Sequence, residues 1–116
     1  MRQIDVKRRF PAPTADAIQR ATRALVDAAH PERIVLFGSH ARGDFHPHSD
    51  LDLLVILPSV EDPFEEAARL RLTLMDLPLA IDLIVMSRAE VEERAHLRGT
   101  MLYHALREGR VLYDAA

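Results

Sequence analysis

The stretch that decides the fold runs from Gly38 to Asp52 and reads GSHARGDFHPHSDLD. It lies between two apolar runs, IVLF and LLVIL, and each run has the length of a buried β-strand. Gly38 and Ser39 close the first run, while Asp50 and Asp52 open the second. The pattern therefore predicts two core strands with polar side chains at the ends that face the connecting segment. A brief helical turn at 40–45 is expected within that segment.

Outward from this stretch, helices and strands alternate along the chain. Ser, Thr and Asp residues at typical N-cap positions start the helices, and Pro or Gly residues end them. The expected elements are helices at 14–29 and 62–75, a helix from Ser87 to Gly109, and strands at 34–37, 50–57, 79–85 and 110–113. Such alternation indicates an α/β fold, with a small mixed sheet of three to four strands flanked by helices in a single domain over 1–116.

The composition is that of a folded domain. Of the 116 residues, 48% are hydrophobic and 28% are charged, which excludes a disordered chain. The net charge of −3 argues against a dedicated duplex-DNA binder, so no direct DNA binding is expected. Because the chain has no cysteine, disulfide scaffolds, zinc ribbons and thiol nucleophiles are excluded. We find no secretory signal and no apolar run near the ~18 residues of a membrane span, so a cytoplasmic protein without membrane contact is expected.

Asp50 and Asp52 are the first candidates for chemistry. Side chains two residues apart in a strand leave the same face, so the two carboxylates lie together while Leu51 points into the core. Like charges placed side by side repel, which indicates that a positive group belongs between them. Hard oxygen ligands of this kind suit Mg²⁺ or Mn²⁺. The alternative is a pair of solvated aspartates at the open end of a strand.

Asp82 is the one charged residue in the apolar run 79–86, so its strand is expected to be buried around it. A buried carboxylate costs several kcal/mol unless it is paired. If this strand lies beside the Asp50–Asp52 strand, three carboxylates converge in the arrangement that two-metal phosphoryl chemistry needs. The alternative is a structural ion pair between Asp82 and an arginine.

Gly38 and Ser39 follow a buried strand and precede a short helical segment. Glycine lets backbone amides approach a ligand closely, and the serine adds a hydroxyl for a phosphate oxygen. A Gly-Ser pair at a strand end is also an ordinary turn, so the pair indicates a phosphate site only in combination with the carboxylates.

Taken together, these residues resemble the signature of the DNA-polymerase-β-type nucleotidyltransferase superfamily. In that signature a Gly-Ser pair is followed ten residues later by Asp-x-Asp, and a third carboxylate lies on a later strand; here residues 40–49 are the ten. The Ala-Arg-Gly after the Gly-Ser pair and the Ser before the Asp-x-Asp are similar to the minimal (MNT-type) group. The resemblance extends over about 34–85.

The resemblance implies a polymerase-β-like fold and a role for each matching residue. The implied nucleotide-binding residues are Gly38, Ser39, Arg42 and Ser49. The implied catalytic residues and metal ligands, for Mg²⁺ or Mn²⁺, are Asp50, Asp52 and Asp82. By the same analogy Asp82 accepts the proton of the attacking hydroxyl. The alternative to phosphate binding by Arg42 is a surface ion pair with Asp44.

A partner protein is expected to supply the acceptor, because the chain after Asp82 has room for one helix and a short strand. Minimal nucleotidyltransferases commonly accompany a helical HEPN-domain protein as antitoxin to a ribonuclease toxin, and some transfer AMP to a tyrosine of that toxin. The resemblance thus implies transfer of a nucleoside monophosphate, AMP from ATP, to a hydroxyl of a HEPN-type toxin. One alternative is a non-catalytic antitoxin that acts by binding alone. The other is a small-molecule nucleotidyltransferase similar to the antibiotic-modifying enzymes.

The last expected helix is the candidate surface for that partner. It mixes Leu97, Leu102, Tyr103 and Leu106 with charged residues, so its apolar side chains serve either the core or an interface. We expect the isolated protein to expose an apolar patch that a partner covers.

Overall fold

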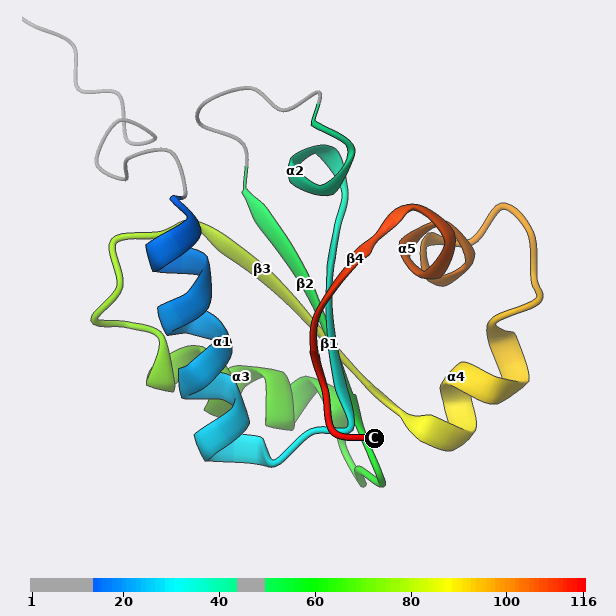
Figure 1. Cartoon of the computed structure of the whole chain (residues 1–116). Helices are drawn as coiled ribbons and strands as arrows, with labels where there is room; N and C mark the ends of the chain where they lie inside the picture. Colours follow the sequence, from blue (N-terminus) through cyan, green and yellow to red (C-terminus); the bar gives the residue numbers. More distant parts are fainter. Residues whose placement is uncertain (1–13, 44–49) are drawn as a thin grey trace, which may run out of the picture.

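The structure is a computed structural model that describes residues 14–43 and 50–116 (Figure 1). In chain order the elements are α1 (Ala15–Ala29), β1 (Arg33–Phe37), α2 (Ser39–Arg42), β2 (Leu51–Leu57), α3 (Pro63–Thr73), β3 (Ile81–Ser87), α4 (Arg88–Arg94), α5 (Met101–Glu108) and β4 (Arg110–Asp114). No helix within the described ranges is both long enough and apolar enough to cross a bilayer.

The four strands form one mixed sheet in the order β3-β2-β1-β4, which confirms the predicted fold class. β1 is antiparallel to both β2 and β4. β2 and β3 are parallel, and α3 provides the crossover between them. A parallel pair needs such a crossover, because the chain must return to the starting edge of the sheet.

Helices cover both faces of the sheet (Figure 1). Alternate residues of β2 separate into two cores, as expected for a strand that is buried on both sides. Leu51, Leu53 and Val55 pack with α1 and α3, whereas Leu54 and Ile56 pack with α5. Asp52 follows the same alternation, so it lies on the α5 side of the sheet.

The predicted helix starts are present with their capping hydrogen bonds. Thr14 Oγ1 accepts from Ala17 N at 3.1 Å. Asp62 Oδ1 accepts from the backbone N–H groups of Phe64 and Glu65, each at 3.1 Å. These caps satisfy amide groups that have no partner inside the helix.

The single helix expected from Ser87 to Gly109 is wrong, because two helices occupy this segment. Ser87 caps α4 as predicted, with its Oγ 3.1 Å from Glu90 N. Gly99 then has a φ of +81°, a backbone conformation incompatible with a continuing helix. Thr100 caps a new helix by accepting from Tyr103 N at 3.1 Å. A strong second N-cap therefore divides the amphipathic segment.

The structure also corrects the expected start of β3 and the expected role of the apolar side chains in the last helix. β3 begins at Ile81 rather than at Leu79, because it pairs residue by residue with β2 from Leu51 onward. In the last helix, Leu102 is only 3% exposed and packs into the core. The apolar side of α5 therefore serves the core more than an interface, although Leu97 before it is 44% exposed.

Candidate active site

Asp52 and Asp82 lie side by side at one end of the parallel strand pair. They are direct register partners, Asp52 on β2 and Asp82 on β3, and register partners in neighbouring strands share a face of the sheet. Asp50 lies two residues before Asp52, and Leu51 between them is fully buried on the other face. The structure thus pairs two of the three predicted carboxylates, Asp52 and Asp82, whereas no three such side chains of the described residues gather into one metal-binding group.

Asp82 is exposed, which corrects the expectation that its strand buries it. It is the second residue of β3, and the buried part of the strand begins with Leu83. Asp82 therefore reaches solvent at the end of the strand, although its neighbours in the sequence are apolar. Within 14–43 and 50–116, Asp82 forms no ion pair with an arginine, the arrangement that the structural alternative required.

Asp52 is partly buried and electrostatically strained. Burial raises the pKa of Asp52 above its ordinary value, and the negative charges of Asp82 and Asp50 raise it further. His40 and Arg42, on α2, act in the opposite direction and lower the pKa of Asp52. The neighbouring carboxylates and the α2 side chains therefore have opposite effects on the pKa of the same carboxyl group.

Gly38 brings the backbone against this carboxylate. Its φ of +74° is in a region that favours glycine. A Cβ at this position would lie 3.2 Å from Asp52 Cγ and would overlap its Oδ2. Ser39 then begins α2, and the predicted helical turn is confirmed up to Arg42. The end of the predicted turn, and Ser49, lie outside the described residues.

Arg42 connects the site to the last helix. Its Nη1 lies 3.8 Å from Glu108 Oε2, and both side chains are about half exposed. Glu108 is not among the site residues predicted from the sequence, and no local signal marks it, because α2 and α5 are far apart along the chain. His104, one turn earlier on α5, is exposed and lies 3.7 Å from the same carboxylate.

Comparison with known families agrees with this geometry. The model of the nucleotidyltransferase domain family matches residues 18–106, which is more than half of the chain and includes all three carboxylates. The chain belongs to this family. The matched region of the nucleotidyltransferase domain begins in α1 and ends in α5.

Curated relatives resemble this nucleotidyltransferase domain over part of their own length. The bifunctional uridylyltransferase/uridylyl-removing enzyme of Pseudomonas putida is 35% identical over 81 residues, which is 68% of this chain and 9% of that enzyme. The enzyme of the same name from Bordetella avium is 42% identical over 60 residues, 50% of this chain and 7% of that enzyme. The chain therefore spans less than a tenth of the length of these two relatives.

Solved structures share the fold. A crystal structure of a Sulfolobus solfataricus protein assigned to the nucleotidyltransferases has a TM-score of 0.62 at 16% identity, covering 86% of this chain and 79% of that one. A toxin-antitoxin structure with AMP-PNP has a TM-score of 0.53 at 23% identity. The match covers 83% of this chain and 73% of that one. At these identities the likeness concerns the fold alone.

The oxygen donors at the site fit a hard divalent cation. Mg²⁺ usually binds through one or two carboxylates, with water and substrate phosphates completing its coordination. Asp52 and Asp82 are the side chains placed to provide this pair, and Asp50 is their neighbour. Among the described residues, no three His, Asp or Glu side chains form a ready-made metal cluster, so the site is not a closed protein cage.

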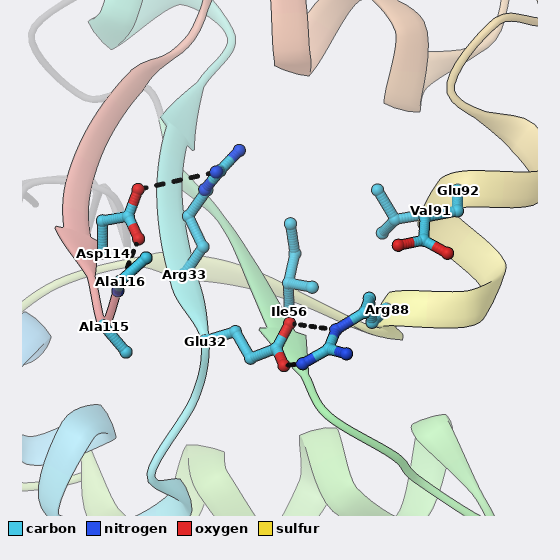
Figure 2. Close-up of a pocket in the computed structure, with 9 residues that line it drawn as sticks. All are labelled: Glu32, Arg33, Ile56, Arg88, Val91, Glu92, Asp114, Ala115 and Ala116. Carbon is cyan, nitrogen blue, oxygen red and sulfur yellow. Dashed lines mark hydrogen bonds and ion pairs between the residues drawn. The ribbon is translucent and has the colours of Figure 1, made fainter.

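A separate pocket lies at the other end of the nucleotidyltransferase sheet (Figure 2). It is lined by residues near Ile56, four positions beyond Asp52 on β2. Its two arginines are paired: Arg33 lies 3.5 Å from Asp114, and Arg88 donates to Glu32 Oε2 at 2.8 Å. None of the predicted site residues lines this pocket, so we do not assign it to catalysis.

Proposed function

We propose that this nucleotidyltransferase is an antitoxin that transfers AMP from ATP to a hydroxyl of a helical HEPN-type toxin, with Mg²⁺ or Mn²⁺ at its carboxylates. The observation that carries the proposal is the pairing of Asp52 with Asp82 beside the Gly38-Ser39 turn. The shared fold with toxin-antitoxin structures supports a toxin partner.

In this proposal, each residue of the site has a defined task. The Gly38-Ser39 turn and Arg42 hold the triphosphate, together with Ser49. Asp50, Asp52 and Asp82 hold the divalent cations, which would neutralise charge on the phosphates when bound. Catalysis then consists mostly of positioning and electrostatic stabilisation.

The transfer itself is an in-line displacement. The acceptor hydroxyl oxygen forms a bond to the α-phosphorus, the bond between that phosphorus and the bridging oxygen breaks, and pyrophosphate leaves. The hydroxyl proton passes to the carboxylate of Asp82. The exposure of Asp82 suits this task, because an acceptor on another protein must reach its oxygen atoms from outside.

A uridylyl donor is the second candidate, favoured by the relatives that carry the uridylyltransferase name. The site residues have the same tasks for either nucleotide, since they act on the phosphates rather than the base. The two candidates therefore differ in the nucleotide selected and not in the chemistry.

The test is transfer of radiolabel to the protein encoded by the neighbouring gene. That protein is mixed with Mg²⁺, the wild-type chain, and ATP or UTP labelled at the α-phosphate. We expect a labelled partner with the wild type and with Asp27→Asn, which changes an exposed aspartate on α1, and none with Asp52→Asn or Asp82→Asn. Label from UTP alone would assign uridylyl transfer. A partner that binds but stays unlabelled with every nucleotide would contradict catalysis and favour neutralisation by contact.

A further inference from the structure

The end of α5 is held directly against β1, the strand that leads into the candidate site. Gly109 follows the last residue of the helix, and a Cβ there would lie 2.6 Å from Val35 Cγ1 and 2.9 Å from the Leu36 carbonyl oxygen. These distances leave room for glycine only, so the backbone next to Glu108 lies on β1 itself. Glu108 is therefore fixed close to the point where β1 enters the site.

The rest of α5 is anchored by buried side chains. Leu102 and Ala105 are buried, and they belong to one apolar core with Val35 and Phe37 of β1. Burial of apolar surface sets the position of this helix. The side chain of Glu108, at the end of the helix, is about half exposed and can meet a group on a neighbouring element.

The short helix α2 lacks such an anchor. None of its four residues is buried, and the Arg42 side chain at its end is about half exposed. A long side chain of this kind loses conformational entropy when a ligand fixes it. Arg42 Nη1 lies 3.8 Å from Glu108 Oε2, so the anchored helix provides a charged partner for the guanidinium. A side chain that is already held loses less entropy on binding.

Arg42 also acts on the site. It lowers the pKa of Asp52, which means that its guanidinium lies within electrostatic reach of that carboxylate. A guanidinium has five N–H donors in a planar fork, so a contact with Glu108 is compatible with a contact to phosphate. Arg42 therefore interacts with one carboxylate outside the site and with one inside it.

The two oxygen atoms of the Glu108 carboxylate face different groups. Oε2 is the atom near Arg42, whereas Oε1 lies 3.7 Å from His104 Nδ1. His104 is one turn earlier on α5, so this contact restricts the carboxylate from within its own helix. The carboxylate thus meets Arg42 from a restricted position.

We propose that Glu108 is a positioning residue that holds the Arg42 guanidinium for the phosphates of the nucleotide. The role rests on the proposed function, because that function assigns Arg42 to the triphosphate. The negative charge of Glu108 would itself repel a phosphate. Its contribution to binding must therefore pass through Arg42, and this dependence can be measured.

The test is a double-mutant cycle on nucleotide affinity, measured by isothermal titration with Mg²⁺ and whichever of ATP and UTP the wild type binds. Glu108→Gln removes the charge and keeps the size of the side chain, and it should lower the affinity about threefold to fivefold. Glu93→Gln, which changes an exposed carboxylate on α4, should leave the affinity unchanged. Arg42→Gln should lower the affinity about tenfold or more. In the Arg42→Gln background, Glu108→Gln should have no further effect.

Thermal melts and transfer kinetics separate positioning from a structural role. Glu108→Gln should melt close to the wild type, since the side chain is exposed. In the transfer assay it should raise the KM for the nucleotide about threefold to fivefold and leave kcat within about twofold. A merely structural role would lower the melting temperature and leave the KM of the folded molecules unchanged.

Three results would overturn the role of Glu108 while the wild type still binds nucleotide. The first is an unchanged or raised affinity in Glu108→Gln. The second is a double variant in which the two losses multiply, because Glu108 would then act without Arg42. The third is full affinity in Arg42→Gln, which would leave Glu108 with no group to position. A wild type that binds neither nucleotide would instead contradict the proposed function itself, and this role with it.

Discussion

Asp52 on β2 and Asp82 on β3 are direct partners in the parallel register, although thirty positions separate them along the chain. Two carboxylates held this close repel one another unless a cation lies between them. Asp82 is exposed at the open end of its strand, and Asp52 is only partly buried. The pairing therefore has measurable consequences for stability and for ligand binding.

Asp82→Asn should separate the catalytic role of this residue from a structural one. Without metal, the variant should be as stable as the wild type or more stable, since one like charge is removed. With Mg²⁺ and nucleotide at about ten times their dissociation constant, the wild type should gain about 1.4 kcal/mol, a rise in melting temperature on the order of 3–8 °C. The variant should lose most of this rise and nearly all transfer, while still binding its protein partner. Calorimetric melts with and without ligand measure both effects.

A stabilising structural role for Asp82 would give the opposite pattern. The variant would then melt below the wild type without metal. It would nevertheless retain the full shift with Mg²⁺ and nucleotide. That combination of results would exclude Asp82 from the catalytic residues.

The pH dependence of stability should report on Asp52. Its folded-state pKa is raised above the ordinary value of 3.8, so the folded chain binds a proton more tightly than the unfolded chain does. The charged carboxylate therefore destabilises the metal-free fold, fully so above the raised pKa and not at all below about pH 3.8, where both states are protonated. Asp52→Asn should melt above the wild type at pH 7, and this difference should shrink as the pH falls toward 4. Urea unfolding at several pH values measures the sign of this stability difference, and Asp27→Asn is the exposed control. A variant that is less stable than the wild type at pH 7 would contradict the assigned strain.

Gly38→Ala and Gly43→Ala test two glycines that both have positive φ. Gly43, with φ +85° and ψ +3°, lies in the left-handed helical region, where an L-residue costs about 1–2 kcal/mol. Gly38, with φ +74° and ψ −158°, lies in a region that is essentially restricted to glycine, so its substitution carries a larger backbone cost. A Cβ at Gly43 meets nothing within 4 Å, whereas one at Gly38 overlaps the Asp52 carboxylate. We therefore expect Gly38→Ala to lower the free energy of unfolding more than Gly43→Ala does, and to reduce nucleotide affinity as well. Equal losses in the two variants would mean that neither the Gly38 backbone conformation nor the Asp52 contact adds a cost.

Ser39→Ala should have a milder effect than Gly38→Ala. Loss of one hydrogen bond to phosphate costs roughly 0.5–1.5 kcal/mol, which corresponds to a reduction in affinity of about twofold to tenfold. Isothermal titration with ATP and UTP, in the presence of Mg²⁺, measures this change. Unchanged affinity for both nucleotides would remove Ser39 from the proposed phosphate site.

Much of the fold follows from local patterns in the sequence. The two apolar runs around the Gly38–Asp52 stretch became neighbouring core strands, and the caps at Thr14, Asp62 and Ser87 begin helices as expected. These features depend on spacing and on hydrogen bonds between near neighbours. For this reason they can be recognised without knowing the tertiary structure.

The features that were missed depend on contacts between distant segments or on competition between local signals. Gly99 and Thr100 divide the last helix because a positive-φ glycine and a second cap outweigh a continuous apolar stripe. The exposure of Asp82 depends on where β3 starts, and that start is set by its register with β2. The contact of Arg42 with Glu108 depends on how α5 packs, which no short pattern encodes.

The parallel pairing of β2 and β3 also has a consequence for how the domain folds. In the unfolded chain Asp52 and Asp82 are far apart, so their repulsion arises only when β3 docks after the α3 crossover has formed. Contacts of such high sequence separation form slowly, because the intervening loop must close first. A chain in which β3 has not yet docked lacks the carboxylate that faces Asp52. Ligand affinity that depends on both aspartates would thus be confined to molecules that have finished folding.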